Sequence, residues 1–378
     1  MIIGVPRERK TLEKRVAITP YAAAELIKAG HTVLVERDAG LGSHFSNDDF
    51  GTVGCTIADS LRQVWSDAEL VLKVKEPHEE EFEFFREDLL LFDYLHLASL
   101  PTETDALLKG GVTALAYELV QTSDGRLPLL EPMSEVAGKL SILNGAHALL
   151  AQNGGRGVLL GGTIGVPPRR VTIVGAGIAG LAACEMALGM GAIVTVLDIS
   201  VRALERVKHQ FQNRARTVYS TQSSLFEECS RADLVIGAVL VPGAAAPKLV
   251  TREIVKNMKN GAAIVDISID QGGCVETMRP TSLDSPTYVE EGVIHYAVTN
   301  MPAQTPRTST MALVAATLPY IKRLAGMGFI EAMEQNPALR NSLHTHKGQL
   351  TNAAVAKSLN LSYTSIEAAL SGKERQGE

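Results

Sequence analysis

The architecture of this chain follows from one segment, Val171-Thr-Ile-Val-Gly175-Ala-Gly177-Ile-Ala-Gly180. A short run typical of a buried strand leads into glycines spaced as Gly-x-Gly-x-x-Gly, and a helical pattern follows. This order of strand, glycine turn and helix binds the diphosphate of a dinucleotide. Gly175 permits the tight turn, Gly177 lets the diphosphate approach the backbone, and Gly180 lets helix and strand pack closely. Taken alone the motif is weak evidence, because a glycine-tolerant turn in another α/β fold has the same spacing.

A second apolar run strengthens the interpretation. Ile193–Leu197 predicts a strand, and Asp198 follows it, 18 residues after Gly180. An acid at this place accepts hydrogen bonds from a ribose 2′-hydroxyl and repels a 2′-phosphate, so Asp198 favours NAD over NADP. The neighbouring Arg202 weakens this preference, because an arginine can serve a 2′-phosphate.

Strand and helix patterns alternate along the chain. They predict an α/β fold with two Rossmann-like, doubly wound parallel-sheet domains. The strands expected in the first series are Ile2–Val5, Thr32–Glu36, Leu70–Lys75, Leu89–Leu95 and Thr113–Tyr117. Those expected in the second are Val171–Val174, Ile193–Leu197, Leu234–Val239, Ala262–Ile269 and Val293–Val298.

Helices connect these strands. Thr19-Pro20 has the chemistry that begins a helix, and Gly30 is placed where that helix ends. The stretch from Ser134 to Gln152 predicts a longer connecting helix opened by Ser134. Beyond Pro306 we expect helices in place of strands, with Thr351 capping one of them, and we expect this tail to pack on the first domain.

Composition and charge exclude several classes of protein. With 378 residues, 46% of them hydrophobic and 21% charged, the chain can bury two cores and is not disordered. Its net charge of −6 leaves no broad basic surface, so we expect no nucleic-acid partner. The cysteines lack CxxC spacing and are expected to be ordinary reduced thiols; they are Cys55, Cys184, Cys229 and Cys274.

One apolar segment is long enough to suggest a membrane span. Val171–Leu197 also holds Glu185 and five glycines, which weaken a single continuous helix. The start of the chain, Met1–Val5, runs into the charged stretch Arg7–Arg15 and lacks the pattern of a signal peptide. We therefore expect a cytoplasmic protein without a membrane partner.

Polar residues that close apolar strands are the first candidates for chemistry, because ligands gather at the carboxyl ends of parallel strands. Lys75, His96 and Asp270 stand at such positions, and alternation places Lys73 on the same face as Lys75. Each also has a structural interpretation: a solvated lysine, a hydrogen-bonded histidine, and an aspartate that caps a turn.

Oxidative deamination of an amino acid would use all three side chains. The ammonium group must lose a proton before hydride leaves Cα, and the iminium then needs activated water. A histidine assisted by a carboxylate suits these proton transfers. The substrate carboxylate needs cations, preferably an arginine, but periodicity does not identify which arginine.

A set of segments distributed over nearly the whole chain resembles the alanine dehydrogenase family. They are Arg15-Val-Ala-Ile-Thr-Pro20, Leu72-Lys-Val-Lys-Glu-Pro77, Leu95-His-Leu-Ala98, Pro132-Met-Ser-Glu-Val-Ala-Gly138, Gly154-Gly-Arg-Gly157, Ile236-Gly-Ala-Val-Leu-Val-Pro-Gly243, Val265-Asp-Ile-Ser-Ile-Asp-Gln-Gly-Gly273 and Asn300-Met-Pro302. The resemblance implies that Arg15 and Lys75 bind the substrate carboxylate and that His96 and Asp270 form the acid/base pair. It also implies cofactor contacts from Ser134, Ile178, Ala179, Asp198, Ser220, Val239, Leu240, Ile267, Ser268, Ile269, Asp270, Arg279, Val298, Thr299, Asn300 and Met301.

The resemblance further implies a substrate domain of residues 1–128 and 307–378, completed by C-terminal helices, and an NAD-binding domain of residues 129–306. A cleft that closes during turnover and a homohexamer are expected on the same ground. Some family members carry an acidic residue and a histidine on a C-terminal helix. Here that stretch reads Lys322-Arg-Leu-Ala-Gly-Met327, so we expect no metal, and we expect His344 and His346 to be surface residues.

The expected function is reversible, NAD-dependent deamination of L-alanine to pyruvate and ammonium. One alternative is the nucleotide-binding component of a proton-translocating transhydrogenase, which needs no amino-acid carboxylate site. Others are a dehydrogenase that joins lysine to a keto acid, which needs a larger pocket, and a non-catalytic NAD sensor.

Overall fold

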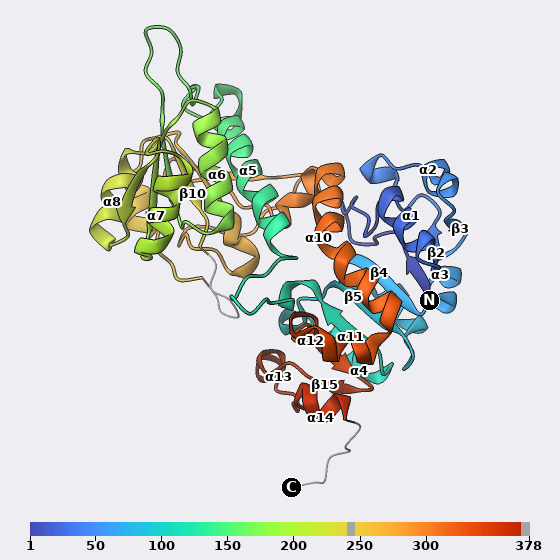
Figure 1. Ribbon diagram of the computed structural model, residues 1–378. Coiled ribbons are helices and arrows are strands. Elements are labelled where there is room, and N and C mark those ends of the chain that lie inside the picture. Colours follow the sequence, from blue (N-terminus) through green and yellow to red (C-terminus); the bar gives the residue numbers. More distant parts are fainter. Residues whose placement is uncertain (240–245, 372–378) are drawn as a thin grey trace. The chain divides into compact units, whose positions relative to one another are not determined.

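The computed structural model describes residues 1–239 and 246–371, which divide into two compact units (Figure 1). Unit 1 consists of Met1–Met133 and Ala303–Glu378, and unit 2 of Ser134–Pro302. The C-terminal segment therefore belongs to the same unit as the N-terminal one.

The sheet of unit 1 has the strand order β15-β14-β6-β5-β4-β1-β2-β3. Its strands are β1 Ile2–Val5, β2 Thr32–Glu36, β3 Thr56–Ala58, β4 Leu70–Lys75, β5 Leu90–Tyr94, β6 Thr113–Ala116, β14 Leu343–His346 and β15 Gln349–Leu350. Strands β1 to β6 pair in parallel, whereas β14 is antiparallel to β6 and β15. The order 3-2-1-4-5-6 of β1 to β6 is that of a doubly wound sheet.

Helices cover both faces of this sheet. They are α1 Pro20–Lys28, α2 Asn47–Thr52, α3 Leu61–Asp67, α4 Pro101–Lys109, α10 Pro306–Met327, α11 Phe329–Gln335, α12 Pro337–Arg340, α13 Ala353–Leu359 and α14 Ile366–Leu370. Alternation along β4 assigns the two faces: Leu70 and Leu72 pack with α1 and α10, whereas Val71 packs with α3, α4 and α13. As expected, the side chain of Thr19 caps α1, and Gly30 follows that helix at a φ of 91°.

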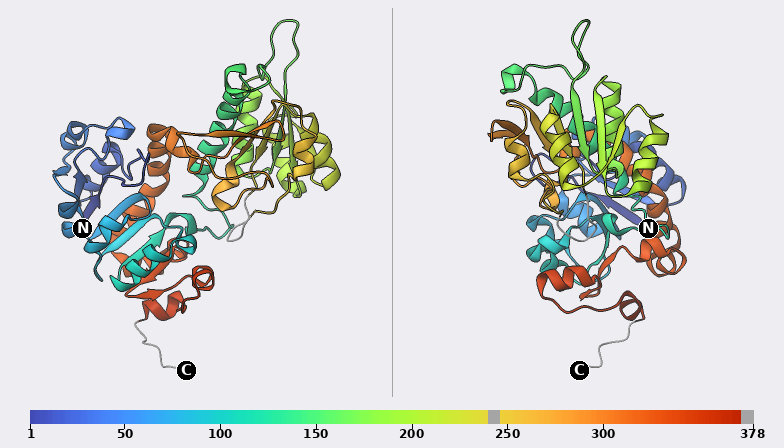
Figure 2. Two further views of the ribbon diagram at one scale, coloured as in Figure 1. Left: turned by 180° about the vertical axis from the view of Figure 1, so that it is seen from behind. Right: turned by 90° about the vertical axis from the view of Figure 1, so that its left-hand side faces the viewer.

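The sheet of unit 2 has the order β12-β13-β11-β10-β7-β8-β9, again 3-2-1-4-5-6 for its parallel strands. Its strands are β7 Arg170–Val174, β8 Ile193–Asp198, β9 Arg216–Tyr219, β10 Leu234–Gly237, β11 Ala263–Asp266, β12 Thr287–Glu290 and β13 Val293–Tyr296. Its helices are α5 Glu131–Ala148, α6 Ile178–Gly189, α7 Val201–Gln210, α8 Gln222–Arg231 and α9 Arg252–Lys256. Helices α5 and α6 lie side by side (Figures 1 and 2), and a Cβ atom at Gly138 would lie 2.2 Å from the carbonyl oxygen of Ala179.

The two doubly wound α/β units confirm the expected fold class, with several local corrections. Strands do not stop at Pro306, since β14 and β15 extend the first sheet. The long connecting helix begins at Glu131, so Ser134 does not open it, and Pro132 occupies its first turn, where a missing N–H costs little. Asn352, and not Thr351, caps α13.

His344 and His346 were expected at the surface, and this prediction was wrong. Both lie on β14 and are buried. The His346 Nδ1 is 2.9 Å from the Thr113 hydroxyl, and its ring stacks on that of Phe329. Burial lowers the pKa of His344 to about 4, so that side chain is neutral at pH 7.

Candidate active site

The residues expected to bind substrate gather at one edge of the sheet in unit 1. Arg15 lies in the segment that follows β1, Lys75 ends β4, and His96 follows β5. Strands β1, β4 and β5 are parallel neighbours, so their carboxyl ends share an edge. The reversal of strand order between β1 and β4 makes this edge a topological switch point, the usual ligand site of such sheets.

Glu8 connects the ends of β1 and β4. Its carboxylate accepts hydrogen bonds from the N–H groups of Val74, at 2.6 Å, and Lys75, at 3.3 Å. Burial raises the pKa of Glu8 to about 7, against the lowering effect of Lys73. The end of β4 is thus held by a side chain and not by sheet pairing alone.

Lys73, on the same strand as Lys75, is buried and pairs with two carboxylates. Its ammonium lies 3.0 Å from Glu81 and 3.4 Å from Glu8, and all three side chains are buried. Burial would lower the pKa of Lys73, but the two carboxylates outweigh it and raise that pKa. Glu81 is thus a buried partner of Lys73, whereas Glu79 and Glu80 beside it are exposed.

Arg15 is 2% exposed and forms a two-pronged ion pair with Glu13. Its Nε is 2.7 Å from Glu13 Oε1, and its Nη2 is 2.6 Å from Oε2. Burial opposes the charged form, yet Glu13 outweighs it and the pKa of Arg15 is raised. The Nη1 atom contacts the sulfur of Met133 at 3.2 Å.

Helix α10 holds the segment that carries Arg15. The N–H group of Val16 donates to the Thr310 hydroxyl on α10 at 3.1 Å. The same hydroxyl is 2.9 Å from that of Ser43, which in turn donates to the Lys14 carbonyl at 3.0 Å. Folding of the C-terminal segment onto unit 1 is therefore required to place the arginine.

His96 has a left-handed backbone, with a φ of 49°, which is uncommon for a residue other than glycine. Its side chain is 43% exposed. The ring lies parallel to that of Tyr94, with centroids 6.0 Å apart, and the Tyr94 hydroxyl donates to the Leu129 carbonyl. Glu118 approaches both the backbone and the ring of His96.

The glycine motif of unit 2 has the geometry that each glycine was expected to provide. Gly175 has a φ of 108°, and a Cβ there would lie 2.4 Å from the Ala238 carbonyl oxygen. A Cβ at Gly180 would collide with the carbonyl oxygen of Gly175. At Gly177, which caps α6, no described atom lies within 4 Å of the Cβ position. This open side of the backbone at a helix N-terminus suits a diphosphate.

Asp198 ends β8 beside this turn. Its Oδ2 accepts a hydrogen bond from the Ala176 N–H, and its Oδ1 from the Ser200 N–H, both at 2.7 Å. Ser220 follows the next strand, and its N–H donates to the Asp198 carbonyl oxygen at 2.9 Å. The acid is thereby held where the first two βα turns meet, the place that a ribose takes in this fold.

Asp270 lies in a turn, η6 (Ile267–Gln271), that follows β11. The buried carboxylate of Asp266 organises this turn by accepting from the N–H groups of Ser268, Cys274 and Val275. The Asn300 N–H donates to Asp270 Oδ2 at 3.3 Å, and the Ser268 hydroxyl donates to the Val239 carbonyl at 2.6 Å. These contacts connect the expected cofactor residues at Val239, Ile267–Asp270 and Asn300 within unit 2.

The remaining expected cofactor residues also belong to unit 2. The guanidinium of Arg279 lies over the Tyr288 ring, 3.9 Å from its centroid, and the Arg279 N–H donates to the Tyr288 hydroxyl. Val298 pairs with Thr281, and Met301 begins a short 3-10 turn. Ser134 lies one turn before Gly138, the contact between α5 and α6. Leu240 lies outside the described residues.

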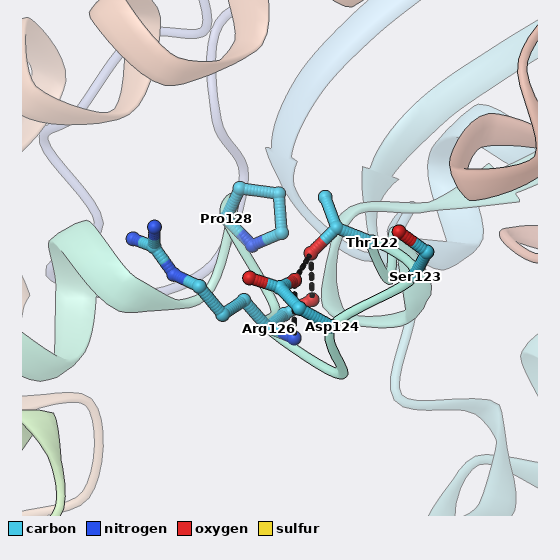
Figure 3. A pocket seen from close by; sticks show the side chains of 5 residues that line it. All are labelled: Thr122, Ser123, Asp124, Arg126 and Pro128. Carbon is cyan, nitrogen blue, oxygen red and sulfur yellow. Dashed lines mark hydrogen bonds between the residues drawn. The ribbon is translucent and has the colours of Figure 1, made fainter.

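One hollow of the described surface lies away from the expected site residues. A hollow of about 390 Å³ is lined by Thr122, Ser123, Asp124, Arg126 and Pro128 (Figure 3). In Figure 3 Thr122 and Asp124 turn toward each other, while the Arg126 side chain extends away from them. Arg126 forms an ion pair with Glu131. None of the expected site residues lines this hollow.

Over residues 1–239 and 246–371, no group of three or more histidine, cysteine, aspartate or glutamate side chains is placed to hold a metal ion. Among the helices that the structure describes, none combines the length and apolar character needed to cross a membrane. The described cysteines are all buried thiols without a disulfide partner.

Two family models match the chain in succession, and the second extends past unit 2 into the C-terminal part of unit 1. Residues 4–137 match the family model described as alanine dehydrogenase/PNT, N-terminal domain, and residues 141–353 match the corresponding C-terminal domain. The chain belongs to the alanine dehydrogenase/PNT family. The expected family resemblance is thereby confirmed.

Several relatives of this family match almost end to end. An alanine dehydrogenase of Staphylococcus saprophyticus is 51% identical over 98% of this chain and 100% of its own length. One from Mycolicibacterium smegmatis is 52% identical over 96% of this chain and 98% of its own. A solved L-alanine dehydrogenase superposes with a TM-score of 0.93 at 45% identity, covering 95% of this chain and 99% of that one. A transhydrogenase from Sinorhizobium meliloti, at 22% identity and a TM-score of 0.82 over 93% of this chain and 100% of that one, shares the fold.

In this member of the alanine dehydrogenase/PNT family, sequence reasoning missed the carboxylates that hold the strand ends. Glu8 accepts hydrogen bonds from backbone N–H groups at the end of β4, and Glu118 and Asp266 accept them from N–H groups beyond a strand. Each stands within a few residues of the end of a parallel strand, which is the signal that could have identified them. Sequence position alone does not reveal which backbone groups they bind.

Proposed function

We propose that this chain catalyses the reversible, NAD-dependent oxidative deamination of L-alanine to pyruvate and ammonium. The observation that carries the proposal is the identity of about one half with named alanine dehydrogenases over 96–98% of the chain. The gathering of Arg15, Lys75 and His96 at one sheet edge supports it, because amino-acid deamination needs cations for a carboxylate and a proton carrier together.

Unit 1 is the proposed substrate domain. Arg15 and Lys75 bind the carboxylate of alanine, and Glu13 keeps the guanidinium plane of Arg15 in place. Tyr94 and Met133 are proposed to limit the side chain of the substrate, since Met133 contacts the Arg15 guanidinium and Tyr94 stacks on His96. A small amino acid fits this arrangement.

Unit 2 is the proposed NAD-binding domain. The open backbone at Gly177 and the N-terminus of α6 hold the diphosphate, and Asp198 binds the ribose hydroxyls. When bound, NAD⁺ supplies the chemistry of hydride acceptance from the substrate Cα. Gly175, Gly180 and Ser220 shape the same edge, and the proposed nicotinamide contacts come from Ile267 through Asp270 and Val298 through Met301.

His96 and Asp270 are the proposed acid/base pair. His96 removes a proton from the substrate ammonium. His96 and Asp270 then transfer the protons of the attacking water and of the departing amine. The substitution H96A should abolish turnover of alanine while NADH, followed by its fluorescence, still binds. Near-normal activity of that variant would contradict the assignment of His96.

The rival functions make different demands. A transhydrogenase component transfers hydride between nucleotides and needs neither Arg15 nor Lys75; the likeness to one at 22% identity concerns the fold alone. A non-catalytic sensor would bind NADH and turn over no amino acid. An enzyme that joins lysine to a keto acid would turn over with those two substrates and not with alanine.

We further propose a homo-oligomer, with a hexamer expected from the family resemblance. A loop of unit 2 between α5 and β7 supports this, because it extends away from its sheet (Figure 1) and exposes Leu159, Ile164 and Val166. Light scattering behind size exclusion tests the assembly: a mass of six chains is expected, and a monomer would contradict it. The cytoplasmic location stays a prediction.

A further inference from the structure

Glu118 lies just beyond β6, in the short turn η4 (Tyr117–Leu119). Because β5 and β6 are parallel neighbours, this turn shares an edge with the segment that follows β5. The Glu118 carboxylate accepts hydrogen bonds from two successive N–H groups of that segment, Leu95 at 3.3 Å and His96 at 2.7 Å. These bonds stabilise the left-handed backbone of His96, which local preference does not favour.

The same carboxylate faces the ring of His96. The His96 Nδ1 lies 3.6 Å from Glu118 Oε1, the oxygen that also holds the His96 backbone. The Glu118 side chain is 13% exposed, so its charge is screened less by water than a surface charge would be. The Tyr94 ring lies parallel to the His96 ring, with centroids 6.0 Å apart.

Other titratable groups surround the pair. Asp93 on β5 is buried, and burial together with the Glu118 charge raises the pKa of Asp93 well above its usual value. His344 on β14 is neutral at pH 7, because burial lowers its pKa. Tyr94 is also neutral, since burial raises its pKa. Lys357 stands on α13, which packs against the turn after His96, and is exposed.

We propose that Glu118 is a positioning residue for His96: its carboxylate sets the orientation and the tautomer of the imidazole that moves protons. A carboxylate beside Nδ1 favours the ring form with the proton on Nδ1, so Nε2 carries the lone pair that receives the substrate proton. The negative charge also stabilises the imidazolium that forms at that moment. This inference rests on the proposed function, in which His96 is the proton carrier.

The substitution E118Q separates charge from shape. Glutamine keeps an oxygen that can accept the His96 N–H and removes the negative charge. We expect kcat for alanine to fall about tenfold or more. We also expect the KM for alanine to change much less than kcat, because the proposed carboxylate contacts, Arg15 and Lys75, are untouched. NADH affinity should remain as in the wild type.

The matched control is E36Q. Glu36 ends β2 at the same edge of the sheet, is similarly buried, accepts a hydrogen bond from the Arg7 N–H at 2.7 Å and pairs with Arg9. Like E118Q, E36Q removes a buried negative charge and keeps an oxygen that can accept the backbone N–H, but Glu36 pairs with Arg9 and not with His96. We expect E36Q to lower thermal stability and to leave kcat for alanine close to that of the wild type. An unchanged kcat in E118Q would overturn the proposal.

Nitrogen-15 NMR of the neutral His96 ring, assigned with H96Q, tests the inference without turnover. In the wild type the ring is expected to carry its proton on Nδ1, and in E118Q the proportion of this tautomer is expected to fall. A proton on Nε2 in the wild type, or equal tautomer proportions in the two proteins, would overturn the proposal even if E118Q proves too inactive for kinetics. Failure of the wild type to oxidise alanine would instead contradict the proposed function.

Discussion

Gly180 packs so closely on Gly175 that a Cβ atom at Gly180 would lie 1.9 Å from the Gly175 carbonyl oxygen. At Gly177, by contrast, the Cβ position is open. Gly180 is therefore needed by the fold, whereas we propose that Gly177 is needed by the ligand, although both belong to one motif. A helix and a strand can approach this closely only because no side chain separates them.

Alanine at Gly180 should impair stability, whereas alanine at Gly177 should impair NADH binding. G180A should lose about 2 kcal/mol or more in free energy of unfolding, because the rigid backbone cannot yield to the added methyl group. G177A should keep its melting temperature and bind NADH about tenfold more weakly, since the methyl group fills the proposed diphosphate site. Calorimetry and NADH titration measure the two effects. Equal affinity of G177A and the wild type would contradict the site.

Lys73 and Lys75 form a second matched pair on β4. K73M should lower the free energy of unfolding by about 3 kcal/mol, because Glu8 and Glu81 would lose their buried partner. K75M should cost less stability than K73M, because Lys75 is only partly buried, and should raise the KM for alanine at least about tenfold, from loss of a carboxylate contact. Chemical denaturation and steady-state kinetics distinguish them. An unchanged KM in K75M would remove Lys75 from the substrate site.

Asp198 should control cofactor choice. In D198N the carboxylate that repels a 2′-phosphate is gone, while an amide oxygen remains to accept one of the bonds from Ala176 and Ser200. We expect the ratio of kcat/KM for NAD⁺ to that for NADP⁺ to fall by about tenfold or more, roughly 1.4 kcal/mol. A ratio that does not change would show that another group excludes NADP.

Asp93 should make stability depend on pH. Neither of its buried oxygens has a hydrogen-bond partner among the described residues, and its pKa is raised by burial and by Glu118. The folded chain therefore retains a proton that the unfolded chain loses, so stability falls as pH rises toward the folded pKa. Glu8, with a pKa raised to about 7, acts in the same direction at lower pH.

The variant D93N lacks this dependence. Its melting temperature relative to the wild type should therefore rise as pH increases above the ordinary pKa of an aspartate, and Glu8, which both proteins carry, does not account for that difference. Thermal melts across these pH values, with D88N as an exposed control, measure the difference. A constant difference would contradict the protonated state of Asp93.

Much of the architecture could be predicted because its signals are local. The alternation along β4 and the capping chemistry of Thr19-Pro20 require no knowledge of distant residues. The antiparallel strands β14 and β15 escaped prediction because each is short, and because β14 is stabilised by pairing with β6, far away in sequence, while β15 pairs with β14. Burial of His344 follows from the same long-range pairing.

Prediction of the candidate site divides in the same way. Residues with an apolar strand before them, such as Lys75 and Asp198, are recognisable by position. Arg15 is not, because it lies in an irregular segment and is placed by Thr310 and Glu13 through tertiary contacts. Only the family resemblance assigned it a role. Glu118 could have been noticed from its position just beyond β6, but its relation to His96 required the paired strands.

The most direct measurement is the absorbance of NADH when the purified chain is mixed with L-alanine and NAD⁺, and in reverse with pyruvate, ammonium and NADH. The same assays with NADP(H) give the cofactor preference. Formation of NADH in the first mixture and its consumption in the second, with little activity from NADP(H), is the predicted result. Tight NADH binding without reaction in either direction would contradict the proposed function and favour a sensor or a transhydrogenase component.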